Sequence, residues 1–208
     1  MLISRGNLKI GELPSFSLPV ITTCPGMTPF CERYCYGLKG NFNLQNVKDA
    51  NDRRLEASLR NDFVDIVVKE IRQTKTPAFR LHVVGDFFIV EYVEKWIRIA
   101  TTLNNVIFFG STRAWRCDFL SEAVKRFRDM DNVYLKASTD LTDSVHPCVG
   151  WNVWSVEGQG LACPHDEGKV ANCFVCKRCW TTKKIDVKFK LRWGDVGEYI
   201  TPSMFSEN

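Results

Sequence analysis

The sequence predicts an α/β fold: a parallel sheet of repeated strand–helix units, arranged as a partial, open TIM-barrel-like structure. Short β-rich runs alternate with amphipathic helical stretches along the middle of the chain. Short motifs recur with a period of about 27 residues, which suits one strand, one helix and two short loops. Asn105-Val106 returns as Asn132-Val133, and Ser111-Thr112 returns as Ser138-Thr139. Successive units of this kind place their strands side by side and parallel.

Five strands and three helices are expected in this arrangement. The strands are predicted at 16–22, 79–84, 106–109, 133–137 and 153–156, where β-branched and aromatic residues cluster. The helices are predicted at 48–73, 89–103 and 119–127, where apolar residues recur at the spacing of one helical face. Pro77 ends the first helical stretch, and Gly85 ends the second strand.

The C-terminal part of the chain differs in character from the rest. We expect an α/β core over 1–160 and, over 161–208, a Cys-rich metal-binding segment followed by a basic β tail. Apolar residues at 185, 187, 189 and 191 alternate with polar ones, which is a strand pattern. Eight Lys and Arg residues against three Asp and Glu residues over 161–192 offer contacts to nucleic acid. The alternation favours an ordinary solvated strand over that function.

Composition indicates a folded chain with a sizeable core. The 208 residues are 45% hydrophobic, 12% aromatic and 25% charged, which excludes a disordered chain. Lys and Arg number 28 against 24 Asp and Glu, a net charge of +4. This excess is too small to indicate a general nucleic-acid-binding protein.

Neither a secretory signal nor a membrane helix is expected. Arg5, Lys9 and Glu12 interrupt the first twenty residues, where an apolar core would have to run. The longest uncharged stretch, 13–31, contains four prolines and cannot form a membrane helix. We therefore expect a cytoplasmic protein with no membrane partner. In a reducing compartment, nine cysteines indicate metal ligands or redox chemistry rather than disulfides.

Three cysteines in one loop form the first cysteine group: Cys24, Cys31 and Cys35, with gaps of six and three residues. A structural zinc site needs four protein ligands, and no histidine lies in this loop to complete one. Three thiolates can instead hold a [4Fe–4S] cluster that leaves one iron open to a small molecule. The prolines and glycines of the loop allow the thiolates to converge. Chance clustering of three cysteines is the alternative.

Four further cysteines form the second cysteine group: Cys163, Cys173, Cys176 and Cys179. The two successive two-residue gaps resemble the cysteine triplet of bacterial ferredoxins, with Cys163 as a remote fourth ligand. An iron–sulfur cluster is therefore favoured, with zinc or no metal as the alternatives. His165 is close enough in sequence to compete as a ligand, but a solvated surface position is favoured for it. The two remaining cysteines, Cys117 and Cys148, are expected to be small buried hydrophobic residues.

Polar residues follow the expected strands. In parallel α/β folds, active sites are built at the carboxyl ends of the strands, so these residues should face one opening. The candidates for contact with a small molecule are Gly85, Asp86, Ser111, Arg113, Ser138 and Glu157. Asp86 suits an ammonium group, and Arg113 suits a carboxylate. Ordinary turn and cap chemistry is the alternative, with Asp86 capping a helix that begins near Phe88.

Three runs carry a resemblance to a known family. The runs SFSLPVITTCPGMTPFCERYCYGLKG, FRLHVVGDFF and FFGSTRAW resemble the phage-encoded family named after mycobacteriophage gene product eighty-eight. The resemblance extends over residues 4–180. It implies an iron–sulfur protein located in the host cytoplasm, without identifying an activity.

The layout is also similar to that of radical S-adenosylmethionine enzymes. Those enzymes place a three-cysteine loop after the first strand and a GGE-like motif, which holds the methionyl amine, after the second. Here the cysteines are spaced more widely than in the usual loop, and Gly85-Asp86-Phe87 stands where GGE would. The similarity implies S-adenosylmethionine as the cosubstrate.

Two functions fit these features. The first is an iron–sulfur enzyme with an open-site cluster on the first cysteine group and a second, four-cysteine cluster. The alternative is a non-catalytic iron–sulfur or zinc protein that binds nucleic acid or a host protein through its basic tail.

Overall fold

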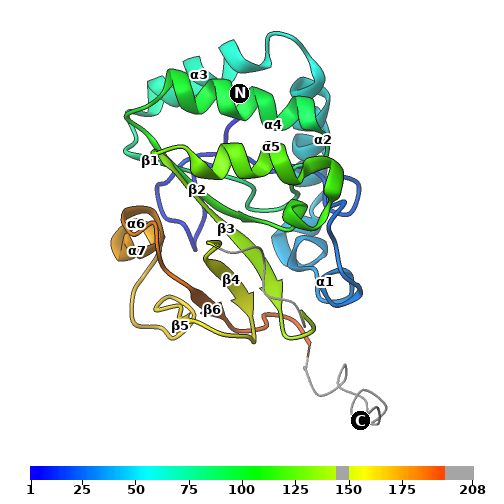
Figure 1. Ribbon diagram of the computed structural model, residues 1–208, viewed down its shortest axis with the longest axis vertical. Coiled ribbons are helices and arrows are strands. Elements are labelled where there is room, and N and C mark those ends of the chain that lie inside the picture. Colours follow the sequence, from blue (N-terminus) through cyan, green and yellow to red (C-terminus); the bar gives the residue numbers. More distant parts are fainter. Residues whose placement is uncertain (144–149, 195–208) are drawn as a thin grey trace.

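Six parallel strands form one open sheet in the computed structural model, which describes residues 1–143 and 150–194 (Figure 1). Their order across the sheet is β1-β2-β3-β4-β6-β5. The strands are β1 (Ala78–Arg80), β2 (Ile107–Thr112), β3 (Val133–Asp140), β4 (Val153–Val156), β5 (Leu161–Ala162) and β6 (Val187–Phe189). Every pair of neighbours is parallel, which confirms the predicted α/β class. The sheet is open, with β1 and β5 at its edges, so the barrel-like arrangement of strand–helix units is not confirmed.

The helices of the described residues include short and long ones. The α-helices are α1 (Pro29–Arg33), α2 (Gln45–Leu59), α3 (Phe63–Thr74), α4 (Val90–Thr102), α5 (Asp118–Asp129), α6 (Cys173–Cys176) and α7 (Arg178–Thr181). The 3₁₀ turns are η1 (Tyr36–Leu38), η2 (Gly40–Asn43) and η3 (Ala114–Arg116). The helices α4 and α5 confirm those predicted at 89–103 and 119–127.

The single helix predicted over 48–73 is wrong, because residues 60–62 form a turn that separates α2 from α3. The Lys95 side chain of α4 stabilises this turn. Its Nζ donates to the carbonyls of Ser58 (2.7 Å) and Arg60 (2.9 Å), at the C-terminal end of α2. Apolar periodicity misses such a break when both helices bury their faces in the same core, as α2 and α3 do.

The strand predicted at 16–22 is mostly wrong. An extended segment beside β1 makes one isolated parallel bridge, between Ser15 and Arg80. The N–H of Phe16 donates to the carbonyl of Arg80 at 3.1 Å. Beyond it, Pro19 has no N–H to donate to a neighbouring strand, and Ile21 adopts a φ of 68°, which ends the extended conformation.

The other predicted strands are confirmed: β4 has the predicted bounds, and β1, β2 and β3 have shifted ends. β1 stops at Arg80 rather than at residue 84, since His82 adopts a φ of 41°, outside the strand region. β2 and β3 extend further than predicted. As a result, Ser111 and Ser138 lie within strands rather than after them.

The strand register divides the sheet residues between two faces. Phe79 and Phe108 are paired neighbours that pack with Trp96 of α4 in the larger core. The next pair, Arg80 and Phe109, lies on the opposite face, because successive strand residues alternate. Helices α3, α4 and α5 lie together on the first side of the sheet, and α6 and α7 lie on the other (Figure 1).

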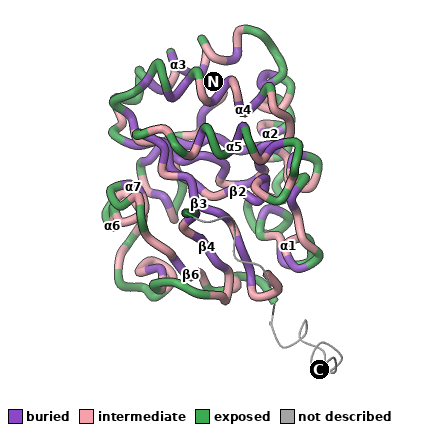
Figure 2. The backbone as a smooth tube through the Cα atoms, viewed as in Figure 1, coloured by how far each residue is buried: buried purple, intermediate pink, exposed green. Residues whose placement is uncertain are grey.

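The second face is covered by segments from both ends of the chain. Ile10 and Leu13 from the N-terminal segment, with Cys163 and Trp180 from the Cys-rich segment, pack around Trp154 of β4. Buried residues run along the strands between the two layers (Figure 2). Both faces of the parallel sheet are therefore closed to water over much of their area, as such sheets require.

The basic tail belongs to the same sheet as the core. β6 pairs with β4 on one side and β5 on the other. Val187 is buried and Lys188 is exposed, which confirms the predicted alternation. The division of the chain at residue 160 stays a prediction. Within the described residues, each helix is too short or too polar to cross a membrane.

One prediction concerns Asn132, whose side chain forms hydrogen bonds with the end of α4 and with the segment that leads from α4 into β2. Its buried Nδ2 donates to the carbonyls of Ala100 (3.0 Å), Leu103 (3.2 Å) and Val106 (3.1 Å). Asn132→Ala should lower the free energy of unfolding by about 1–3 kcal/mol, because three buried carbonyls lose their donor. Asn105, at the equivalent place in the sequence repeat, is exposed. Asn105→Ala should therefore change it by less than about 0.5 kcal/mol. Urea unfolding of both variants measures the difference, and equal losses would contradict this role.

Candidate functional site

A cavity of about 890 Å³ opens on the face of the sheet opposite helices α3, α4 and α5. Both cysteine groups contribute to its wall. Cys31 and Cys35 come from the first group, and all four members of the second group line it. Arg80 of β1, Ser111 of β2, Ser138 of β3 and Trp154 of β4 contribute from the sheet, with Tyr36 of η1. The fold thus brings together two cysteine groups that lie more than a hundred residues apart in the sequence.

The first cysteine group lies on a turn and a short helix. The hydroxyl of Thr28 caps α1 by accepting from the N–H of Cys31 at 3.0 Å, and Pro29 occupies the first turn. Cys31 lies within α1, and Cys35 lies just after it, as the N-cap residue of η1. The two cysteines are four residues apart in the sequence, which is about the length of one helical turn. Cys24 lies upstream, where its N–H donates to the carbonyl of Ile21 at 3.1 Å.

Burial keeps the thiols of this group protonated in the metal-free chain. It raises the pKa of Cys24 to about 12 and raises the pKa values of Cys31 and Cys35. Cys31 and Cys35 each raise the pKa of Cys24 further, so the three sulfurs lie within electrostatic range of one another. Ligation of a metal cation would offset the cost of ionising them.

The second cysteine group is held by β5, α6 and α7. The N–H of Cys163 donates to the carbonyl of Lys188 on β6 at 2.9 Å. Asn172 caps α6 through its side chain, which accepts from the N–H of Val175 at 3.0 Å. Lys177 has a φ of 59° and turns the chain between α6 and α7. These contacts place four thiols around one part of the cavity: Cys163, Cys173, Cys176 and Cys179.

The thiols of this second group also interact electrostatically. Burial raises the pKa of Cys179 to about 12, and the other three cysteines of the group raise it further. Arg80 acts in the opposite direction and lowers the pKa values of Cys173 and Cys179. His165, for which a solvated surface position was favoured, is partly buried and lines the cavity.

The donor sets fit thiolate-bound metal chemistry, although the side chains are not arranged around a common point. Among residues 1–143 and 150–194, no three Cys, His, Asp or Glu side chains are placed so that they could hold a metal ion without moving. Cys117 is partly buried against the larger core and does not line the cavity. Cys148 lies outside the described residues.

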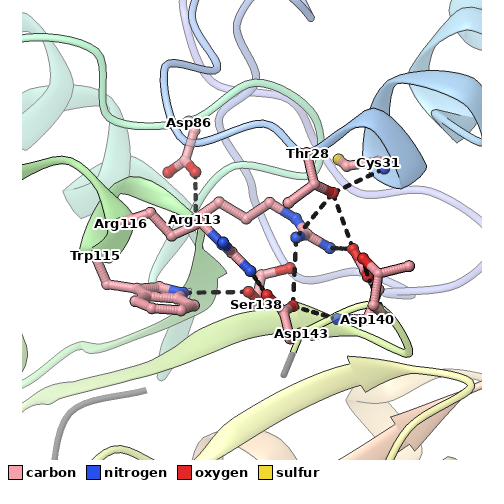
Figure 3. A network of polar contacts seen from close by, with 10 residues as sticks. Thr28, Cys31, Asp86, Arg113, Trp115, Arg116, Ser138, Asp140 and Asp143 are labelled. Carbon is pink, nitrogen blue, oxygen red and sulfur yellow. Dashed lines mark hydrogen bonds and ion pairs between the residues drawn. The ribbon is translucent and has the colours of Figure 1, made fainter. Parts of the chain in front are cut away.

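Asp86 is buried, and its carboxylate ties the end of β2 to the loop after β1 (Figure 3). Its Oδ1 accepts from the hydroxyl of Thr112 (2.6 Å) and the N–H of Phe87 (2.8 Å), and its Oδ2 accepts from the N–H of Arg113 (2.7 Å). Burial raises the pKa of Asp86 to about 6, against the effect of these hydrogen bonds. The alternative that Asp86 caps α4 is wrong, because the N-cap of α4 is Ile89 and no side chain caps it.

Arg113 links the first cysteine group to β3 (Figure 3). Its Nη2 donates to Oδ2 of Asp140 at 2.7 Å, and its Nη1 lies 3.7 Å from Asp143. The hydroxyl of Thr28 donates to the same Asp140 oxygen at 3.0 Å. Arg113 also lowers the pKa of Cys31. Arg113 lines the cavity, as predicted for a ligand contact, but its guanidinium already pairs with carboxylates of the chain.

The remaining candidates divide between the cavity and the scaffold. Ser111 and Ser138 line the cavity, whereas Gly85, Asp86 and Glu157 do not. A Cβ at Gly85 would lie 2.6 Å from the Cβ of Leu18, so this glycine permits close packing of the first loop. The Oε1 of Glu157 accepts a hydrogen bond from the N–H of Leu191, just after β6, at 2.6 Å.

Arg80 is a charged cavity residue that was not among the candidates predicted from the sequence. It is 9% exposed, and its guanidinium carbon lies 4.5 Å from the centre of the Trp154 ring. The sequence feature that could have identified it is an arginine inside the apolar run FRLHVV. Burying a charge in such a run costs free energy unless the charge is paired or hydrogen-bonded. Asp140 and Asp143, the partners of Arg113, were likewise not among the candidates.

A model of the family described as Gene product 88 matches residues 1–156. The chain belongs to the Gene product 88 family. The match includes the first cysteine group, Asp86, Arg113 and Asp140, and it ends before the second cysteine group.

Two curated phage proteins are similar to this chain. The Gene 88 protein of Mycobacterium phage D29 is 31% identical over 124 residues, which cover 52% of this chain and 50% of that protein. The Gene 88 protein of Mycobacterium phage L5 is 32% identical over 124 residues, which cover 52% of this chain and 51% of that protein. The chain therefore spans about half the length of the curated relatives it matches. No solved structure matches it.

A second prediction tests the structural role of Asp86. In Asp86→Asn, the amide nitrogen must replace one carboxylate oxygen, so it faces the N–H of either Phe87 or Arg113, both of which are donors. The free energy of unfolding should fall by about 1–3 kcal/mol. Asp52→Asn, at an exposed position of α2, is the control and should change it by less than about 0.5 kcal/mol. Urea unfolding measures both. A silent Asp86→Asn would show that these hydrogen bonds are not required.

Proposed function

We propose that this protein is an iron–sulfur enzyme similar to radical S-adenosylmethionine enzymes. Cys24, Cys31 and Cys35 would hold a [4Fe–4S] cluster with one iron free of a protein ligand. The observation that supports this proposal is the shared cavity. Two cysteines of the first group, all four of the second group and polar side chains of the sheet line one space large enough for a small molecule.

The donor set of the first cysteine group supports a cluster rather than zinc. Three thiols are present, and a closed zinc site requires four ligands. When bound, such a cluster supplies an electron and an open coordination position. The three sulfurs lie within electrostatic range of one another, and side-chain rotations would have to bring them to a common point. Binding requires loss of the thiol protons, and Arg113 favours the thiolate of Cys31.

The chain's own residues have separate tasks in this proposal. Thr28 fixes the position of Cys31 through the cap of α1. Asp86 and Asp140 hold the backbone and side chain of Arg113 beside it. The hydroxyls of Ser111 and Ser138 line the cavity and would orient a bound cosubstrate. S-adenosylmethionine is the leading cosubstrate, on the basis of the similarity in layout.

The second cysteine group would hold a second iron–sulfur cluster, with zinc as the alternative metal. Its four thiols complete either kind of site without an outside ligand. A closed site of this kind serves structure or electron transfer. The segment is anchored to β6 and to the N-terminal loop by backbone hydrogen bonds from Cys163 and Cys173.

A non-catalytic protein that binds nucleic acid is the second candidate. The observation that favours it is the row of exposed lysines on the tail, Lys184, Lys188 and Lys190. Metal identity separates the two candidates, because iron with acid-labile sulfide favours the enzyme. Zinc alone in a colourless protein favours the binding function.

A third prediction tests the open-site cluster. Anaerobically purified protein should contain iron and acid-labile sulfide, and its reduced EPR signal should change when S-adenosylmethionine is added. Cys31→Ser should lose about four irons, because the remaining two thiolates cannot hold a cubane cluster. Cys117→Ser, which alters a cysteine outside the cavity, should keep the wild-type content. An unchanged EPR signal at millimolar S-adenosylmethionine would contradict the cosubstrate assignment. Loss of iron in Cys117→Ser would contradict the open site.

A fourth prediction tests whether the two cysteine groups are independent. Cys176→Ser should release the metal of the second group and expose the C-terminal segment to protease, since its helices α6 and α7 are only four residues each. The first group should retain its iron. Metal analysis and limited proteolysis measure the two effects. Loss of all metal from this variant would indicate one shared site instead.

A further inference from the structure

Arg80 is a buried cation that forms no ion pair with a carboxylate of residues 1–143 or 150–194. It is 9% exposed and lines the cavity, with its guanidinium carbon 4.5 Å from the ring centre of Trp154 and 5.7 Å from that of Phe109. Its Nη1 is buried and has no hydrogen-bond partner in the described part of the chain. A buried charge of this kind is costly unless a partner neutralises it and accepts its hydrogen bonds.

The charges around Arg80 leave the cavity positive. Asp166 is the one carboxylate among the described residues that line it, and it is already 2.9 Å from Lys9 and 3.6 Å from Arg192. Arg113 is paired with Asp140. Eight Lys and Arg residues line the same space: Lys9, Lys39, Arg54, Arg80, Arg113, Arg178, Lys190 and Arg192.

The thiols beside Arg80 do not replace the missing acceptor. Cys173 and Cys179 lie within its electrostatic range. Neither sulfur accepts a hydrogen bond from the buried Nη1, which lacks any partner within the described residues. Thiolates at these positions would reduce the excess positive charge without satisfying this donor. A planar guanidinium with a free N–H suits the oxygen atoms of a carboxylate or phosphate.

We propose that Arg80 is the anion-binding residue of the cavity and takes a carboxylate or phosphate group of the small molecule that binds there. The proposal rests on the proposed function in treating the cavity as the active site, and it adds the chemical class of the substrate. Trp154 and Phe109 hold the guanidinium from the sheet, so the subsite is formed before the ligand arrives.

Anion titration of the full chain, purified anaerobically, tests this subsite. Inorganic phosphate and citrate are the probes, and calorimetry at constant ionic strength measures their affinity. Wild type should bind at least one of them. Arg80→Met should weaken that binding tenfold or more, because hydrogen bonds to a charged group are lost. Arg80→Lys, which keeps the positive charge but loses the planar, bidentate donors of the guanidinium, should have an intermediate affinity. Arg98→Met, which removes an exposed arginine of α4 away from the cavity, should bind as wild type does.

Thermal unfolding provides a second measurement that does not depend on equal folding yields. The bound anion should raise the Tm of wild type and leave that of Arg80→Met unchanged, because ligands stabilise only the form that binds them. Without the anion, Arg80→Met should be at least as stable as wild type, since it removes an unpaired buried charge. If the wild-type chain binds neither probe at millimolar concentration, or Arg80→Met binds equally well, the proposal is wrong.

Metal analysis of the same samples separates this proposal from the proposed function. If Arg80→Met loses the metal of the second cysteine group while anion affinity is unchanged, Arg80 balances the charge of that metal site and the anion proposal is wrong. If the first cysteine group holds no iron but anion binding depends on Arg80, the anion subsite stands and the enzyme proposal fails.

Discussion

A parallel sheet must be covered on both faces, and this requirement organises the whole molecule. The long helices α3, α4 and α5 cover one face with a large apolar core. The opposite face is covered by the N-terminal segment and by the segment that carries the second cysteine group. This second cover is only partly apolar, because it consists of short helices and loops. The cavity lies within it, and both cysteine groups reach the same space as a result.

A chain of buried polar contacts connects the sheet to the first cysteine group. The carboxylate of Asp86 fixes the backbone of Arg113, and the guanidinium of Arg113 pairs with Asp140 on the next strand. Thr28 bonds to the same Asp140 carboxylate and also caps the helix of Cys31. Each of these polar groups forms a hydrogen bond with another member of the network. The network therefore adds rigidity at a site where loops alone would move. The position of Cys31 is therefore linked to strands β2 and β3 as well as to its own loop.

The sequence predicted the parts of the fold that periodicity controls. Helices α4 and α5 were located correctly because each has one continuous apolar face. The turn at 60–62 and the loss of the strand at 16–22 were missed, since a lysine from α4 and a left-handed Ile21 determine them. The cavity residues Ser111, Arg113 and Ser138 could be found from their places along parallel strands. The partner of Arg113 could not, because the pairing with Asp140 depends on the register between β2 and β3.

The region matched to the Gene product 88 family ends at residue 156, just as β4 ends, so it includes the N-terminal part of the second cover but not the Cys-rich part. The larger core lies entirely within the matched region, and so does the first cysteine group. Cys163, Trp180 and Val187, which cover Trp154 and Phe109, lie beyond it. Residues 1–156 alone would therefore expose an apolar strip of the sheet beside the unpaired Arg80. The C-terminal segment closes that strip through β6 and places Cys173 and Cys179 within electrostatic range of the buried cation. Its contribution to the cavity thus follows from its role as the second cover of the sheet.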